Sequence, residues 1–196
     1  MISWEGAYKT TPPWDIGRPQ PAFIELVRAG ELKKGRVLDS GCGTGENALF
    51  LAANGFSVVG VDLSSRAIGT ANAKAIERRL KVDFRLANAV SLNFRDGYFD
   101  NVIDSGLFHT FSDDDRQSYV NEVARVLAPN GRYFMLCFSD KEPTNWGGPR
   151  RITKEEIETT FSPLFNIYYI RDEFFATRIH KNGGKAYLTS ATRRPK

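Results

Sequence analysis

Residues 37–45 read Val37-Leu38-Asp39-Ser40-Gly41-Cys42-Gly43-Thr44-Gly45, with three glycines at alternating positions. The stretch begins as a short apolar strand, and the residues after it have a helical pattern that stops at Asn54. Glycine lets the backbone adopt a positive φ and lets a ligand approach without meeting a Cβ atom. In a doubly wound sheet, ligands bind outside the carboxyl ends of the strands, where this turn would lie. The stretch therefore predicts a ligand-binding loop at one edge of a sheet.

Strand and helix patterns alternate along most of the chain. Apolar runs with many β-branched residues predict strands at 36–39, 56–62, 82–86, 99–105 and 133–138. Helices are expected at 21–30, 46–54 and 64–80, from Ser112 to before Pro129, and after Thr153. The chain then ends in a hairpin pattern, with strands at 168–179 and 186–192. The sequence thus predicts an α/β fold, doubly wound, with a mostly parallel seven-stranded sheet and a C-terminal antiparallel hairpin strand.

Length and composition exclude several classes of protein. The 196 residues fit a single domain, 1–196. The net charge of +4 is too small to argue for nucleic acid, and no apolar run is long enough to cross a membrane. The first residues do not resemble a signal peptide, and two cysteines favour a reducing compartment, so we expect a cytoplasmic protein. The oligomeric state cannot be read from the sequence.

The residues around the glycines indicate what kind of ligand to expect. Asp62 ends the strand predicted at 56–62, and an acid there can accept hydrogen bonds from both hydroxyls of a ribose. Glu46 stands where a dinucleotide-binding turn would have its third glycine. A tightly packed pyrophosphate turn is therefore not indicated, and the expected ligand is a single nucleoside with a small polar appendage.

This run, together with Asp62, resembles the S-adenosylmethionine-dependent methyltransferases with a Rossmann-like fold. The resemblance extends over residues 84–89, 99–109 and 127–138. It implies S-adenosylmethionine as cofactor, with its methionine part surrounded by Asp39, Gly41, Gly43 and Gly45.

The resemblance also implies the residues around the rest of the cofactor. Asp62 would hold the ribose, and Leu63 would pack on the adenine. Asn88-Ala89 stands where the family often has Asp-Ala near the adenine amino group, and the Asn88 amide oxygen could still accept that hydrogen bond. A turn at the surface is the alternative for Asn88. The backbone carbonyl of Ser105 would accept a hydrogen bond from the ammonium group of the cofactor. The neighbouring Asp104 either assists this contact or is a strand-end carboxylate satisfied by backbone N–H groups.

The N-terminal segment, residues 1–20, narrows the group within that family. Its Trp4, Tyr8 and Trp14 resemble the opening of small-molecule thiol, halide and thiopurine methyltransferases, and of bacterial enzymes that methylate quinones and heterocyclic toxins. The resemblance implies that residues 1–20 cover the active site and that Trp14 lines the methionine side, where an aromatic face favours a sulfonium cation. Packing of Trp4 and Tyr8 onto the domain is the structural alternative.

Candidate catalytic and acceptor-binding residues follow from their expected place near the ligand. His109 lies just beyond the strand at 99–105 and could accept a substrate proton near neutral pH; the alternative is a histidine that caps a loop or lines the pocket. Asp15 is the second candidate base. Aromatic side chains suited to a flat or apolar acceptor come from several segments. They are Trp4, Tyr8, Phe108, Phe111 and Trp146. No cluster has convincing metal-ligand spacing, so no metal is expected.

The predicted function is in-line methyl transfer from S-adenosylmethionine to a small molecule: a heterocycle, a phenol or quinol, or a thiol. A tRNA methyltransferase is the main alternative, favoured only by the basic excess. A nicotinamide-dependent oxidoreductase and a non-catalytic nucleoside-binding module are alternatives of other classes. The identity of the acceptor atom and the need for a general base are not determined by the sequence.

Overall fold

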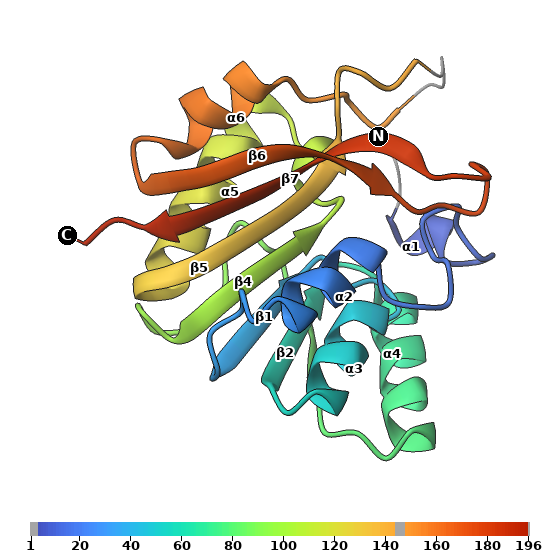
Figure 1. Cartoon of the computed structure of the whole chain (residues 1–196). Helices are drawn as coiled ribbons and strands as arrows, with labels where there is room; N and C mark the ends of the chain where they lie inside the picture. The colour runs from blue at the N-terminus through green and yellow to red at the C-terminus, as the bar shows by residue number, and fades with distance from the viewer. Residues whose placement is uncertain (1–3, 144–147, 196) are drawn as a thin grey trace.

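The computed structural model describes residues 4–143 and 148–195, which build one seven-stranded sheet in the order β3-β2-β1-β4-β5-β7-β6 (Figure 1). The strands are β1 (Arg36–Ser40), β2 (Ser57–Asp62), β3 (Asp83–Leu86), β4 (Phe99–Ser105), β5 (Leu127–Phe138), β6 (Phe165–Phe175) and β7 (Gly184–Arg193). β1 to β5 pair in parallel, whereas β7 runs antiparallel between β5 and β6. The predicted fold class, a mostly parallel doubly wound sheet with a C-terminal antiparallel hairpin, is confirmed.

Helices cover both faces of this sheet. They are α1 (Trp4–Ala7), α2 (Pro21–Arg28), α3 (Glu46–Ala53), α4 (Ser65–Glu77), the short 3-10 helix η1 (Phe108–Thr110), α5 (Asp113–Val126) and α6 (Lys154–Phe161). One core packs beneath α2, α3 and α4, and a second beneath α5 and α6. Adjacent residues of β1 divide between them, with Val37 in the first core and Leu38 in the second. The strand therefore needs apolar residues in succession, because both of its faces are buried.

Three helices begin where the sequence places a capping residue. Ser64 and Ser112 each accept a hydrogen bond from the N–H three residues along the chain. Thr153 and Glu156 form a reciprocal capping box at the start of α6. These caps satisfy N–H groups that have no partner inside the helix, so the helix starts could be predicted from local sequence.

The course of β5 differs from the sequence prediction. The strand begins earlier, at Leu127, which pairs with Phe99, while Arg132 pairs with Asn101. The residues between Leu127 and Arg132 therefore bulge out, and Asn130 adopts a positive φ of 60°. A Pro-Asn-Gly sequence that indicates a turn is accommodated here within a strand, because both flanks pair with β4.

The carboxyl ends of β1, β2, β4 and β5 lie along one edge of the sheet, together with the end of β6 and the start of β7. α1, for which the sequence shows no helix pattern, lies beyond this edge (Figure 1). Within the described ranges, no helix combines the length and apolar character that crossing a membrane requires.

Arg125 in α5 provides a test of how the loop before β4 is held. Its guanidinium donates to the carbonyl oxygens of Leu92 and Phe94 and to the carboxylates of Glu122 and Asp96. Replacing it by methionine, Arg125→Met, leaves those carbonyl oxygens without their partner. We expect the free energy of unfolding to fall by about 2 kcal/mol in urea titrations.

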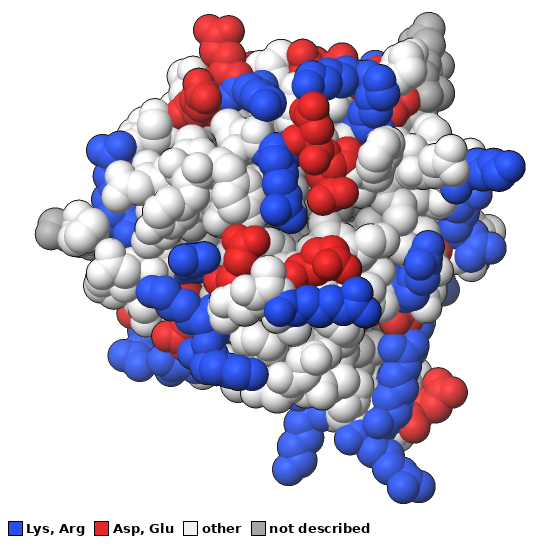
Figure 2. Space-filling model, viewed as in Figure 1, with Lys and Arg blue, Asp and Glu red and all other residues white. Residues whose placement is uncertain are grey.

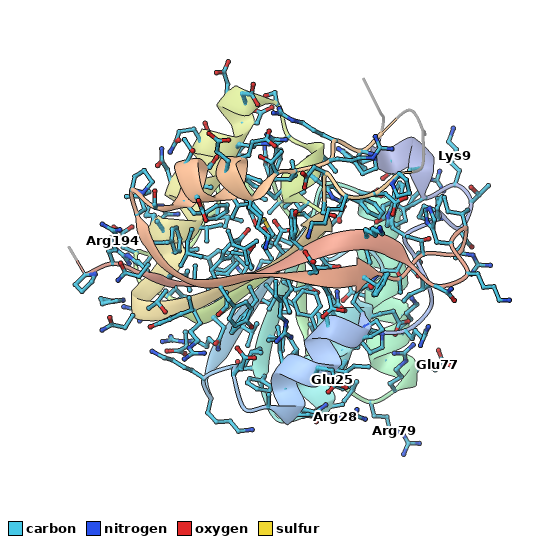
Figure 3. All side chains as sticks on the ribbon, turned by 45° about the horizontal axis from the view of Figure 1, so that its top comes forward. Lys9, Glu25, Arg28, Glu77, Arg79 and Arg194 are labelled. Carbon is cyan, nitrogen blue, oxygen red and sulfur yellow. The ribbon has the colours of Figure 1, made fainter. Side chains whose placement is uncertain are left out.

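The matched control is Arg79→Met, because the Arg79 side chain points away from the body of the protein (Figure 3). This control should stay within about 0.5 kcal/mol of the unmodified protein. Equal effects of the two substitutions would contradict the assigned role of Arg125.

Candidate active site

The loop between β1 and α3 requires glycine because of its backbone and its neighbours. Gly43 and Gly45 have φ values of +53° and +84°, in the region that side chains rarely adopt, and Gly41 is similar at +70°. A Cβ at Gly45 would lie 2.6 Å from the ring of Phe84, and one at Gly43 would lie 2.7 Å from the hydroxyl of Tyr8. β3 and the N-terminal segment therefore both contact this loop closely.

Asp62 joins the glycine loop to the end of β2. Its carboxylate accepts hydrogen bonds from the N–H of Gly43 at 2.9 Å and from the N–H of Ser64 at 2.8 Å. Burial raises the pKa of Asp62, while these N–H groups and that of Leu63 act in the opposite direction. A carboxylate has about four acceptor positions, so this one retains capacity for a ligand hydroxyl. The geometry agrees with a ribose-binding position.

The residues expected around the adenine lie at the adjacent strand ends. Leu63 is 52% exposed directly after β2, so it offers an apolar face to a ligand. Ala89 is buried, whereas Asn88 is exposed and its Oδ1 accepts a hydrogen bond from the N–H of Val90. The oxygen that could meet an adenine amino group is thus engaged in a surface turn here.

Asp39 is a fully buried carboxyl group at the end of β1. Neither of its oxygens has a hydrogen-bond partner in this structure. Burial raises its pKa from an ordinary value near 3.8 to about 8, and the negative charges of Asp104 and Asp62 add to the shift; the nearby backbone N–H of Ala48, which lacks hydrogen-bond geometry, opposes it only in part. A buried polar group without a partner is rare, so this carboxyl beside the glycine loop fits the binding of a cationic group.

Asp104 holds the chain where it leaves β4. Its Oδ1 accepts from the N–H of Leu107, and its Oδ2 accepts from the N–H of Phe108 and from the hydroxyl of Tyr133. Burial raises the pKa of Asp104 to about 6. Of the two roles expected for Asp104, this geometry fits that of a strand-end carboxylate satisfied by backbone N–H groups. Asp104 thus holds the turn that follows Ser105, the half-buried last residue of β4.

His109 occupies a different position from that of a general base. The side chain is 4% exposed, and its Nδ1 accepts a hydrogen bond from the N–H of Phe138 at 3.0 Å. Burial, with the nearby charge of Arg116, lowers the pKa of His109 to about 3. The imidazole is therefore neutral with its proton on Nε2, and we correct the expectation that it removes a substrate proton.

Asp15 likewise serves the fold in this structure. Its Oδ2 accepts from the hydroxyl of Thr44 at 2.8 Å, and its Oδ1 accepts from the N–H of Gly17. The same Thr44 hydroxyl accepts a hydrogen bond from Lys74 in α4. Asp15 thus ties the N-terminal segment to the glycine loop, which argues against its role as a base.

The aromatic side chains of the N-terminal segment form one cluster over the loop. The Trp14 indole N–H donates to the hydroxyl of Tyr8 at 3.1 Å, and the rings of Trp4 and Trp14 meet edge to face with centroids 6.0 Å apart. Burial raises the pKa of Tyr8, with the charge of Asp62 adding to the effect, so its hydroxyl stays protonated. Three residues predicted to line the site are therefore brought together.

The remaining aromatic candidates have other environments. Phe108 is fully buried with its ring 5.2 Å from that of Phe161, so it belongs to the core and not to the wall of an open pocket, which corrects the prediction. Phe111 is half-buried, with its ring 5.1 Å from that of Tyr119. Trp146 lies outside the described residues.

Two features of the site could not be anticipated from the sequence. Glu5 accepts hydrogen bonds from the hydroxyls of Ser64 and Ser65 and pairs with Arg66, so α1 is fastened to the start of α4. The ring of Phe138, in β5, stacks on His109 with centroids 5.1 Å apart. No local pattern marks such residues, because their partners are far away in the chain.

Comparison with known proteins identifies the family to which this architecture belongs. Residues 37–131 match the family model of a methyltransferase domain. The chain is 36% identical over 174 residues to the 2-heptyl-1-hydroxyquinolin-4(1H)-one methyltransferase of Mycobacteroides abscessus, covering 88% of this chain and 74% of that protein. It is 26% identical over 163 residues to thiocyanate methyltransferase 1 of Arabidopsis thaliana, covering 82% of this chain and 71% of the relative.

A solved structure agrees with these relatives. It comes from work on the conversion of a disulfide bond into a thioacetal group during echinomycin biosynthesis, and it superposes with a TM-score of 0.88 at 33% identity. The match covers 97% of this chain and 91% of the other. The matching family model, the named relatives, the glycine loop and the Asp62 carboxylate bonded to it lead to one conclusion. The chain belongs to the S-adenosylmethionine-dependent methyltransferases, in the group that methylates small molecules.

Proposed function

We propose that this enzyme methylates an oxygen or sulfur atom of a small acceptor that is already ionised when it binds. A hydroxylated heteroaromatic ring ranks above a thiol. One observation carries the proposal: His109 and Asp15, the side chains expected to remove a proton, each hold hydrogen bonds of the fold. An acceptor that ionises by itself requires neither of them. The relatives that act on a hydroxyquinolone and on thiocyanate support acceptors of this kind.

The proposed cofactor site consists of the strand-end residues described above. When bound, S-adenosylmethionine supplies a methyl group from its sulfonium and keeps the electron pair of the broken bond, so an anionic acceptor forms the new bond without losing a proton. Asp39 offers its unpaired carboxyl to the ammonium group, and Asp62 offers its remaining acceptor positions to the ribose. The other residues proposed to bind it are Gly41, Gly43, Gly45, Leu63, Asn88, Ala89, Ser105 and Trp14.

The N-terminal segment is proposed to cover this site, with residues 1–196 acting as one methyltransferase domain. Contacts of Tyr8 with Gly43 and of Asp15 with Thr44 support this arrangement. Trp4, Tyr8 and Trp14 then present aromatic faces on the methionine side, which favour a cation and exclude water. Phe111 is proposed as a more distant wall for the acceptor.

Nucleic acid is not the favoured partner. On the face drawn in Figure 2, acidic side chains lie among the basic ones instead of leaving a continuous positive surface. We place the enzyme in the cytoplasm, and the two buried free cysteines, Cys42 and Cys137, support a reducing compartment.

Asp39→Asn tests the cofactor site through stability and affinity together. Because the folded-state pKa of Asp39 is raised, the folded protein holds a proton that the unfolded chain releases, and the free energy of unfolding falls between about pH 4 and pH 8. Asparagine removes this pH dependence. Calorimetry should therefore show that the melting temperature of the variant, minus that of the unmodified protein, rises as the pH increases across that range.

The same substitution should weaken binding of S-adenosylmethionine about tenfold in titration calorimetry, since asparagine cannot give up a proton and become the anionic partner of the ammonium group. The matched control is Asp114→Asn, an exposed residue of α5, which should change neither quantity. Unchanged cofactor affinity in Asp39→Asn would remove Asp39 from the proposed site.

A series of acceptors tests the ionised-acceptor proposal. Hydroxylated quinolines and thiols of graded acidity should be methylated at rates that rise with pH through the ionisation of each acceptor, because only the anion reacts. Release of S-adenosylhomocysteine gives kcat/KM, and the mass of the product identifies the methylated compound. If the pH midpoint of the rate were the same for all acceptors, it would instead reveal a base in the enzyme. Turnover of tRNA alone would overturn the small-molecule assignment.

A further inference from the structure

His109 is held in one orientation and one protonation state by its neighbours. The ring stacks on Phe138 at an interplanar angle of 7°, and the ring of Phe175 lies 5.9 Å away at 38°. The N–H of Phe138 donates to Nδ1, so the single proton of the neutral imidazole resides on Nε2. Two residues, Phe138 of β5 and Phe175 of β6, thus fix the direction of one N–H group of His109.

This N–H group has no hydrogen-bond partner among the described residues. It lies beside Gly106, the residue that follows β4; a Cβ there would lie 3.2 Å from Nε2 and 2.9 Å from the Phe175 ring. Gly106 adjoins Ser105, which is proposed to meet the cofactor. Nε2 is not fully enclosed by protein atoms, so an acceptor atom supplied by a ligand at this end of β4 can reach its N–H.

A buried positive charge lies near His109. The guanidinium of Arg116 is carried by α5, its side chain is 5% exposed, and it lies 5.1 Å above the ring of Phe108. Its Nη1 is 3.4 Å from Asp113 and 3.5 Å from Glu156, while Nε and Nη2 have no partner. These long contacts compensate the charge incompletely, and the charge of Arg116 adds to burial in lowering the pKa of His109.

We propose that His109 donates its Nε2–H to the ionised oxygen or sulfur of the acceptor, and that the charge of Arg116 stabilises that anion. The inference rests on the proposed function, because it requires an anionic acceptor. His109 keeps its proton throughout, so no proton transfer is involved. Its contribution is to hold the acceptor atom in place and to favour the ionised form at neutral pH.

Two substitutions separate this role from a structural one. In His109→Asn the side-chain oxygen can still accept the Phe138 N–H, but no group remains at the position of Nε2. In His109→Gln the longer side chain carries an amide N–H donor toward that position. The matched control is His180→Gln, which changes the second histidine of the chain, in the loop between β6 and β7.

The measurement uses two probes whose absorbance reports ionisation, 1-hydroxyquinolin-4-one and 4-nitrothiophenol. Each is titrated with pH in the complex of enzyme and S-adenosylhomocysteine, which gives the pKa of the bound acceptor. We expect the unmodified enzyme to lower this pKa by about one unit, and His109→Asn to lose most of that shift. The kcat/KM of His109→Asn should fall about 10- to 100-fold, with His109→Gln intermediate and His180→Gln unchanged.

The outcomes distinguish the inference from the function on which it rests. If the unmodified enzyme lowers the acceptor pKa and His109→Asn does so equally, the role of His109 is overturned while the proposed function stands. If the rate of the unmodified enzyme does not follow acceptor ionisation, the proposed function fails and the inference fails with it. Unchanged cofactor affinity in His109→Asn, together with a lost pKa shift, supports the inference.

Discussion

The hydrogen bond from the Gly43 N–H to the Asp62 carboxylate joins the parts on which the rest of the site depends. It connects the loop after β1 to the end of β2, and the same carboxylate also accepts from Ser64 at the start of α4. Only a residue without a side chain can bring its N–H to this position, because the backbone has a positive φ and Tyr8 lies against it. Two strands and a helix are thereby aligned around one backbone turn.

The N-terminal segment is organised around this same turn. Glu5 fastens α1 to the start of α4, Asp15 bonds Thr44 of the loop, and Gln20 exchanges two hydrogen bonds with the backbone of Ala176 after β6. The segment therefore spans the carboxyl edge from α4 to the C-terminal hairpin. A short helix of this kind has little stability by itself, so its position depends on these long-range contacts.

The polar groups at the carboxyl edge of β4 and β5 illustrate how the fold constrains the chemistry. Asp104 and His109 are both titratable, yet each satisfies backbone N–H groups of the chain that leaves the strands. Groups that hold the backbone in this way are poorly suited to exchange protons with a substrate, because protonation would break the bonds that position them. In the arrangement that we propose, the groups left near the acceptor are a fixed N–H and a buried positive charge. A site of this kind would select acceptors by their own acidity.

The sequence was sufficient for features that arise from local interactions. Apolar patterns, capping residues such as Ser64 and Thr153, and the glycine spacing before Glu46 identify most of the strands, the starts of the capped helices and the ligand loop, because each depends on neighbours along the chain. The environments of His109 and Phe108 required the folded chain. Their burial and partners come from β5, β6 and α6, and no spacing in the sequence encodes which distant backbone N–H an imidazole will meet.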